Sequence, residues 1–221
     1  MPALPCSPPS DTCSLTGESE AKRQQILDGA RAVFAQHGFE GASMSAIARE
    51  ANVSKGTLYN YFTCKAELFE AFVEQNCREK LPTALEPIKR NQPVRETLTA
   101  IAQAIINLTT LPESLMLYRI IISEAPHFPK LTDVFWKNGP KIAIETLAEW
   151  LSAQTRQGLL QVEDPVFAAE LFFTMCQTRI THKKRFNMVI ENEEAERQKV
   201  IHTVVDVFLS VHEKNSQPAR V

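Results

Sequence analysis

The sequence predicts an all-α protein, with a small N-terminal helical domain joined to a larger C-terminal helical bundle. Apolar residues recur at helical spacing from Glu20 almost to the end of the chain. No segment shows sustained alternation of apolar and polar residues between hairpin turns, so we expect no strand. The 221 residues contain no visible internal repeat and suffice for one large domain or two small ones.

The first helix is expected to begin near Glu20 and to end at the segment "HGF", residues 37–39. From Ile26 onward, apolar residues at i, i+4, i+7 and i+8 lie on one face of this helix. Gly38 is placed to end it, because glycine readily adopts the left-handed conformation of a helix C-cap.

Two short helices follow, with the lengths of a helix-turn-helix. Ser43 is expected to cap the first, which runs to Ala51, although Ala46 stands where a capping box has an acidic residue. Ser54 is expected to cap the second, which runs to Tyr61.

Further amphipathic helices are expected beyond this motif. One begins at Lys65 and runs to about residue 80, after which Pro82, Pro87 and Pro93 punctuate a connecting region. The segment "NGP" at 138–140 is expected to kink or divide the third of the later helices. These later helices are expected at about 94–110, 113–124, 131–157, 165–187 and 192–213.

Composition limits the function classes. The formal net charge of −2 means that any contact with nucleic acid must come from a local basic patch. The five cysteines show no metal-ligand spacing, and their odd number argues against a disulfide framework, so we expect a cytoplasmic protein without metal or cofactor. No apolar run approaches the ~18–20 residues of a membrane span, and the N-terminus lacks the features of a signal peptide.

The expected domain boundaries follow from these patterns. Residues 1–19 are rich in Pro and Ser and are predicted to form a disordered arm. Residues 20–66 are predicted to form a small domain around the helix-turn-helix, and residues 67–213 a larger helical bundle. Residues 214–221 are expected to be a flexible tail.

The second short helix carries residues whose types suggest contact with DNA. If Leu58 and Phe62 face the bundle, the polar residues of the helix point outward. Lys55 lies at the helix N-terminus, where the helix dipole disfavours a cation unless an anion is nearby. Gly56 allows the backbone to approach a groove, and Asn60 can donate and accept hydrogen bonds at a base edge.

A purely structural interpretation of these residues stays open. Tyr59 and Tyr61 can bind phosphates through their hydroxyl groups, but they can equally pack at the rim of the domain. Lys55 can be a solvated surface charge. The segment 43–65 carries Arg49, Lys55 and Lys65 against Glu50, a local charge of +2, which supports DNA binding only modestly.

The segment "SMSAIAREANVSKGTLYNYFTCKAEL", preceded by "ILDGARAVFAQHGFEGAS", resembles the DNA-binding domain of the tetracycline-repressor (TetR) family over about residues 21–70. The resemblance implies a bacterial, homodimeric transcriptional regulator, usually a repressor, that a small ligand releases from a pseudo-palindromic operator. The resemblance implies that Ser43 and Lys65 contact phosphates. It also implies that Lys55, Gly56, Thr57 and Asn60 lie in the major groove and that Tyr59 and Tyr61 contact the DNA backbone. The implied DNA-binding residues are Ser43, Ser54, Lys55, Gly56, Thr57, Tyr59, Asn60, Tyr61 and Lys65.

The C-terminal half resembles the AefR-like branch of the family more loosely, through "YRIIISEAPHFPKLTDVFWKNGPKIAIETLAEWL". It implies a central cavity for a small apolar or amphipathic ligand, and a dimer interface in the last two long helices, which are apolar over more than one face. The candidate ligand-binding residues are Phe72, Ile101, Ile105, Leu115, Met116, Phe128, Phe135 and Trp136. The candidate dimer residues are Phe172, Met175, Cys176, Val204, Val205 and Phe208.

Two alternatives remain. No GxSxG, P-loop, GxGxxG or HExxH motif is present, so we expect no enzyme, but a helical small-molecule-binding bundle that does not use DNA stays open. A redox-responsive regulator without a classical ligand is the other alternative. Cys64, beside Lys65 at a helix N-terminus, is its best candidate sensor.

Overall fold

The computed structural model describes residues 17–213, so the predicted tail and all but the last three residues of the predicted arm lie outside the described residues. The chain divides into two compact units. Within the described residues, unit 1 comprises 17–76 and 120–135, and unit 2 comprises 77–119 and 136–213. The predicted boundary after residue 66 falls within the helix Lys65–Leu85, which contributes residues to both units.

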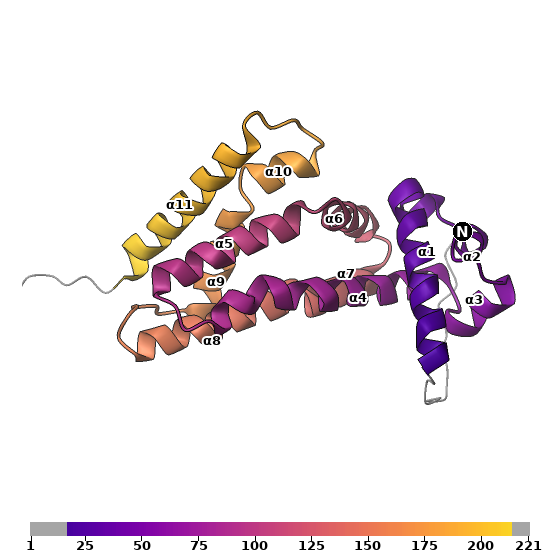
Figure 1. The fold of residues 1–221 in the computed structure, drawn as a ribbon, viewed down its shortest axis with the longest axis horizontal. Coiled ribbons are helices and arrows are strands. Elements are labelled where there is room, and N and C mark those ends of the chain that lie inside the picture. The colour runs from indigo at the N-terminus through magenta and orange to yellow at the C-terminus, as the bar shows by residue number, and fades with distance from the viewer. Residues whose placement is uncertain (1–16, 214–221) are drawn as a thin grey trace, which may run out of the picture. The chain divides into compact units, whose positions relative to one another are not determined.

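Unit 1 begins with α1 (Gly17–Gly41), followed by α2 (Met44–Glu50), α3 (Lys55–Tyr61) and the first half of α4 (Lys65–Leu85), as Figure 1 shows. Helix α1 starts three residues before the predicted Glu20. It is interrupted at Gly38, whose φ of 67° and ψ of −175° are open almost only to glycine. The glycine predicted to end this helix therefore does break it, and a short helical segment follows the break.

The core of unit 1 is a cluster of phenylalanine rings from α1 and α4. The ring of Phe34 meets that of Phe69 edge to face, with 4.9 Å between centroids. Phe39 contacts Phe69 at 5.2 Å and Phe128 at 5.6 Å. These contacts join the helix before the helix-turn-helix to the helix after it, and so support the motif from both sides.

Unit 2 contains the end of α4, the 3-10 helix η1 (Glu86–Lys89), α5 (Val94–Thr110) and most of α6 (Pro112–Glu124). Helix α4 runs to Leu85, past Pro82, where the sequence predicted a connecting region. Proline removes one helical hydrogen bond, but Leu81, Ala84 and Leu85 around it are buried in the core, and this burial offsets the loss.

Two of the expected later helices, 131–157 and 165–187, are each divided into two, and the sequence predicted only the first division. The expected helix 131–157 is divided at Gly139 into α7 (Pro129–Asn138) and α8 (Pro140–Arg156), as the "NGP" segment predicted. The expected continuous helix 165–187 is wrong: α9 (Pro165–Cys176) ends, and α10 (Ile180–Arg185) begins after a turn. Arg179 in that turn has φ 54° and ψ −73°, which no continuous helix allows.

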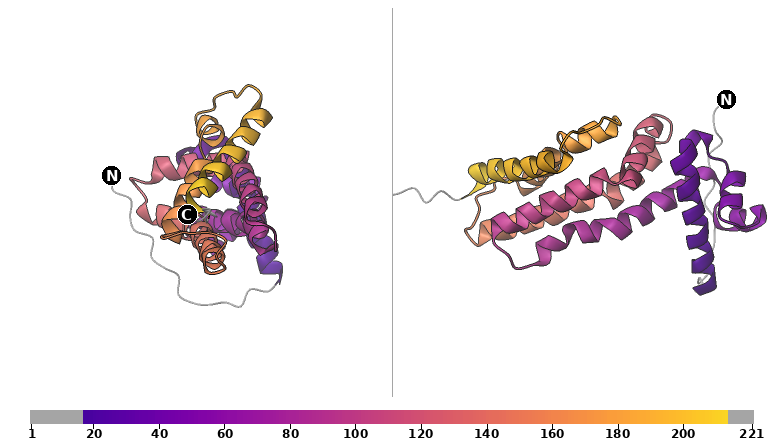
Figure 2. Two further views of the ribbon diagram at one scale, coloured as in Figure 1. Left: turned by 90° about the vertical axis from the view of Figure 1, so that its left-hand side faces the viewer. Right: turned by 45° about the horizontal axis from the view of Figure 1, so that its top comes forward.

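The last helix, α11 (Glu193–His212), lies beside α5 and α9, and α8 packs on α9 (Figures 1 and 2). Leu98, Ile101, Leu147, Phe172 and Ile201 are among the residues of these helices that form one hydrophobic core. No strand occurs in residues 17–213, where Leu160 and Glu213 form only an isolated bridge. The described part of the chain is all-α, as the sequence predicted.

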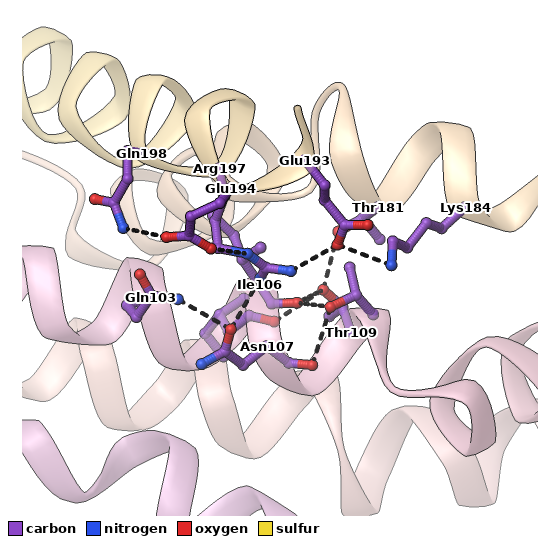
Figure 3. Close-up of polar contacts among 12 residues, drawn as sticks. Gln103, Ile106, Asn107, Thr109, Thr181, Lys184, Glu193, Glu194, Arg197 and Gln198 are labelled. Carbon is purple, nitrogen blue, oxygen red and sulfur yellow. Dashed lines mark hydrogen bonds and ion pairs between the residues drawn. The ribbon is translucent and has the colours of Figure 1, made fainter. Parts of the chain in front are cut away.

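A polar network joins α5, α10 and α11 (Figure 3). The Arg197 Nη1 donates to the Asn107 Oδ1 at 2.8 Å, and its Nη2 lies 2.9 Å from the Glu193 Oε1. Glu193 also pairs with the Lys184 Nζ at 2.8 Å. The Thr109 and Thr181 hydroxyl groups are 3.0 Å apart. These contacts fix α10 between its two long neighbours.

In residues 17–213, no single helix is both long and apolar enough to cross a membrane. Helices α5 and α6 meet the length and composition only when taken together, and the chain bends by 68° at the break between them.

Candidate nucleic-acid interface

The helix-turn-helix is built from two serine caps and a tight turn. The Ser43 Oγ accepts a hydrogen bond from the Ala46 N–H at 3.1 Å, and the Ser54 Oγ accepts one from the Thr57 N–H at 2.9 Å. Both serines satisfy a free N–H in the first turn of a helix. The sequence predicted both caps, and α2 and α3 start one residue after them.

The turn between α2 and α3 closes with a Schellman motif. The Val53 N–H donates to the Ala48 carbonyl at 2.9 Å, and the Asn52 N–H to the Arg49 carbonyl at 3.1 Å. Asn52 has φ 51°, in the left-handed region that asparagine tolerates better than most residues. The angle between the two short helices is thereby set by backbone hydrogen bonds.

Helix α1 holds this turn in place. The Gln25 Nε2 donates to the Ala51 carbonyl at 2.6 Å. A Cβ at Gly29 would lie 2.6 Å from the Ala51 Cβ and 2.7 Å from its backbone nitrogen, so only glycine lets the two helices approach this closely. Sequence patterns did not show this contact, because it joins residues more than 20 positions apart.

Helix α3 divides into an inner and an outer side as predicted. Leu58 is fully buried, and Phe62 at the end of the helix is buried too. Lys55, Gly56 and Asn60 are exposed.

The remaining polar side chains of α3 differ in their exposure and in their hydrogen-bond partners within unit 1. The Tyr59 side chain is 50% exposed. Thr57 is half-buried, and its hydroxyl lies 2.8 Å from the Ser54 Oγ. The Tyr61 hydroxyl lies 3.2 Å from the Ser19 Oγ on α1. Tyr61 and Thr57 therefore have partners in unit 1 in addition to any partner on DNA.

The packing of unit 1 does not require glycine at position 56. A Cβ added there would meet only the Ser54 Oγ, at the ordinary contact distance of 3.7 Å. Alanine would fit and would favour the helix by about 1 kcal/mol. The absence of a side chain at this exposed position leaves the backbone of α3 open to close approach from outside.

Lys65 has a structural partner that the sequence did not suggest. Its Nζ donates to the carbonyls of Phe39 and Glu40, at 2.6 and 3.3 Å, and lies 4.4 Å from the centre of the Phe39 ring. At the start of α4, the Glu67 carboxylate accepts hydrogen bonds from the Thr63 N–H and hydroxyl, both at 2.7 Å. A phosphate at this helix end would therefore meet a lysine already bound to α1.

Arg49 and Ser45 are exposed on α2 and were not among the predicted contacts. Arg49 contributes to the local positive charge of the segment, but nothing in its spacing predicts a role for it. In residues 17–213, no group of three or more His, Cys, Asp or Glu side chains is arranged to hold a metal ion.

The predicted ligand-binding residues fall in both units. Phe72, Phe128 and Phe135 belong to unit 1, and the other five belong to unit 2. Phe72 is buried in the phenylalanine cluster, and Ile101 and Ile105 are buried in the core of unit 2. Leu115 is also buried, whereas Met116 is half-buried and Trp136 is 49% exposed.

The predicted dimer residues need correction at the level of side chains. Phe172, Cys176, Val204, Val205 and Phe208 are buried within unit 2 itself, so they cannot offer a surface to a partner subunit. Met175 is half-buried against the same core. The same two helices expose other apolar side chains, namely Val166, Phe167 and Leu171 on α9 and Val207 and Val211 on α11.

A hollow lined by residues with polar side chains lies where α9 meets α10, with a volume of about 490 Å³. None of the predicted ligand-binding residues lines it. Its lining residues are Thr174, Gln177, Thr178, Arg179, His182 and Arg185. Sequence patterns do not predict this hollow, because it exists only where the expected continuous helix breaks.

Two family models match the chain. Residues 26–72 match the model described as bacterial regulatory proteins, tetR family. Residues 96–214, more than half of the chain, match the model described as AefR-like transcriptional repressor, C-terminal domain.

Two named relatives match about a third of the chain or less. The HTH-type transcriptional regulator UidR of Escherichia coli (strain K12) is 39% identical over 72 residues, 33% of this chain and 37% of UidR. The HTH-type transcriptional repressor AcnR of Corynebacterium diphtheriae is 37% identical over 59 residues, 27% of this chain and 31% of AcnR. The match thus spans only about a third of the length of these curated relatives.

Solved structures match over nearly the whole chain. A TetR-family transcriptional regulator from Mesorhizobium loti, itself described as putative, superposes with a TM-score of 0.83 at 27% identity, covering 90% of this chain and all of that chain. The flavonoid-responsive regulator FrrA superposes with a TM-score of 0.70 at 27% identity, covering 89% and 100%. The matched families and relatives are transcriptional regulators rather than enzymes, in agreement with the sequence prediction. The chain belongs to the TetR family of bacterial regulatory proteins, with a C-terminal domain of the AefR-like type.

Proposed function

We propose that the protein is a cytoplasmic, dimeric transcriptional repressor that binds a pseudo-palindromic DNA operator through α3. The observation that carries this proposal is Gly56, an exposed glycine that the packing of unit 1 does not require. Helix stability alone favours alanine there. Close approach of the helix N-terminus to a DNA groove explains a glycine at this position.

The contact roles follow the two sides of α3. Lys55, Gly56, Thr57 and Asn60 enter the major groove behind the Ser54 cap. Tyr59 and Tyr61 bind the backbone, and Ser43 and Lys65 bind phosphates at the starts of α2 and α4. The bonds from the Lys65 Nζ to the end of α1 hold that ammonium group in one place, which reduces the entropy lost on phosphate binding.

Dimerisation is proposed to use α9 and α11. Five large apolar side chains, Val166, Phe167, Leu171, Val207 and Val211, are exposed on these helices, while their other faces fill the core. Burial against a second copy would remove this apolar surface from water. A two-fold dimer presents two α3 helices, so the operator half-sites should lie about one helical turn or slightly more apart.

Release of DNA is proposed to depend on a small apolar or amphipathic ligand in the C-terminal domain. Helix α4 starts at the helix-turn-helix and continues without interruption past Asn76, where unit 2 begins. A ligand that favours one position of α4 would change the spacing of the two α3 helices in the dimer. The population would then shift toward dimers that fit the operator poorly. The relative named as flavonoid-responsive supports a ligand of this size and polarity.

Binding of genomic DNA fragments, followed by fluorescence anisotropy as a function of salt, tests this function. We expect sequence-selective binding at moderate salt, with an affinity that falls as salt rises. A protein that binds no fragment selectively under these conditions would instead be a ligand-binding bundle that does not use DNA.

The redox alternative has one described candidate. Burial raises the pKa of the Cys77 thiol to about 11, against a smaller opposing effect of Lys80, and burial also raises the pKa of Cys176. Both thiols are therefore poor nucleophiles at neutral pH. Cys64 is half-buried next to the helix-turn-helix. Loss of DNA binding on peroxide treatment that Cys64→Ser prevents would favour this alternative.

A further inference from the structure

The hollow between α9 and α10 has a chemistry that the proposed repressor function does not use. Its walls carry two guanidinium groups, one imidazole, two hydroxyl groups and one amide, and none of the six lining residues is acidic. We propose that this hollow is a binding site for a small molecule bearing an oxyanion, a phosphate or a carboxylate. Its volume of about 490 Å³ lies within the range of small-molecule sites.

Arg185 is the central group of this site. Its guanidinium stacks on the Tyr118 ring at 3.7 Å, and its Nη2 donates to the Gln177 Oε1 at 2.5 Å. Both of these recorded partners are neutral. Its Nε is buried and has no hydrogen-bond partner among the described residues. A buried N–H of a charged group without an acceptor is costly, so Arg185 carries hydrogen-bonding capacity that its neutral partners leave unused.

The surroundings of Arg185 increase the strength of such a bond. Partial burial removes part of the hydration of the guanidinium and so lowers the pKa of Arg185, with a smaller opposing effect of Tyr118. Electrostatic attraction to an anion is stronger in such a medium than in bulk water. The stacked ring also holds the guanidinium in one orientation, so little side-chain entropy remains to be lost on binding.

Arg179 supplies a second, partly compensated charge. Its Nε forms an ion pair with the Glu196 carboxylate on α11. Its backbone, at φ 54° and ψ −73°, lies in a sparsely populated region, a kind of strain that costs about 1–3 kcal/mol and is concentrated at functional sites. The strained turn breaks the helix and brings Arg179, His182 and Gln177 to one opening.

The wall formed by α10 is held rigidly. Lys184 pairs with Glu193 on α11, and the Thr181 hydroxyl contacts that of Thr109 on α5 (Figure 3). Arg119 donates to the carbonyls of Lys184 and Arg185 at 2.9 and 3.1 Å. A site on a wall fixed by its neighbours is already shaped for its ligand, which favours binding.

Calorimetric titration of the full chain tests the site. The probes are pyrophosphate and, separately, citrate, at an ionic strength held constant with sodium chloride. We expect saturable binding of at least one of them, and the tighter of the two assigns the phosphate or the carboxylate class. Arg185→Gln is expected to weaken this binding by at least about tenfold, the effect of losing one charge-assisted hydrogen bond.

Two further variants keep the test decisive. Lys183→Gln removes one positive charge from the same helix without touching the hollow, and it is expected to change the affinity by less than twofold. Thr178→Glu places a carboxylate at an exposed position of the lining and is expected to abolish binding even if Arg185→Gln proves unstable in a thermal melt.

Three results would overturn the proposal. The first is the absence of saturable binding of either anion to the unsubstituted chain. The second is an equal loss of affinity in Lys183→Gln, which would indicate a diffuse basic surface. The third is a lower dimer fraction of Arg185→Gln in sedimentation without any anion binding, which would indicate that a second copy fills the hollow. No DNA enters these assays, so their failure leaves the repressor proposal intact.

Discussion

Gly56 lies at the second position of α3, where an added Cβ would meet only the Ser54 Oγ. The stability of α3 and the proposed contact with DNA therefore favour different residues at this position. Alanine removes the conformational freedom that glycine has in the unfolded chain. The same methyl group would stand between the helix backbone and a groove.

We expect Gly56→Ala to raise the free energy of unfolding by about 0.5–1 kcal/mol and to weaken operator binding at least about tenfold. Urea unfolding and fluorescence anisotropy measure the two effects. Gly17→Ala adds the same methyl at an exposed helical position outside the helix-turn-helix and should leave the affinity nearly unchanged. A Gly56→Ala protein that binds DNA as tightly as the original would remove the main support for α3 as the reading helix.

Asn60 is exposed on the same helix, and the proposal assigns it to a base edge. Asn60→Ala should relax the preference at one base pair by about 1–3 kcal/mol while other positions keep theirs. Selection of bound sequences from a randomised operator library measures this. Uniform weakening at every position would contradict the role.

Lys65→Ala is the matched comparison for Asn60, because the proposal assigns Lys65 to a phosphate. It should weaken all sequences about equally and reduce the salt slope by about one. Its bonds to the end of α1 also predict a small loss of stability. A sequence-dependent effect of Lys65→Ala would contradict a phosphate contact.

At the scale of elements, α9 and α11 each have one apolar side in the core and another exposed. Phe172 is fully buried, whereas Phe167, five residues earlier on the same helix, is 55% exposed. Both residues are apolar, so hydrophobicity alone does not tell which of them faces a partner. The position of each helix in the core decides it.

We expect Phe167→Glu to convert the dimer to monomer, because it places a charge in the proposed apolar interface. Sedimentation velocity at micromolar concentration measures the change. Phe186→Glu makes the same substitution at an exposed aromatic residue outside α9 and α11 and should leave the dimer intact. If the Phe167→Glu protein stays dimeric, the dimer interface does not include the exposed apolar face of α9.

The short helices were predictable because their signals are local. Ser43 and Ser54 lie three residues before the N–H groups that they accept from, and the left-handed turn at Asn52 follows directly after α2. The break between α9 and α10 was not predictable in this way. Nothing in the residue types around Arg179 signals a positive φ, because arginine has no preference for it.

At the scale of the whole molecule, stability should depend on pH through the network around Glu193. The hydrogen bond from Lys184 lowers the pKa of Glu193, against the opposing effect of burial and with further help from Arg197. A carboxylate with a lowered pKa stabilises the folded state at pH values above its unfolded pKa, near 4.5. This stabilisation is lost as the pH falls through the lower, folded value.

We therefore expect Glu193→Gln to lower the melting temperature at pH 7, and the difference from the original protein to close below pH 4.5. Thermal melts across this range measure it. Glu194→Gln is the control, because that side chain is 74% exposed and lies 3.7 Å from Arg197. It should show a smaller difference at pH 7. If the difference in melting temperature between Glu193→Gln and the original protein stays constant with pH, Glu193 acts by packing rather than by charge.

Helical periodicity, cap residues and the helix-turn-helix motif were determined by the sequence itself, because each depends on residues within a few positions of one another. The all-α class and the inner and outer sides of α3 follow from these local rules. Only the tertiary structure decided which apolar residues of α9 and α11 enter the core, that Gly29 meets Ala51, and that a hollow lined by polar residues opens at Arg179. These features depend on contacts between distant segments, and such contacts leave no periodic trace in the chain.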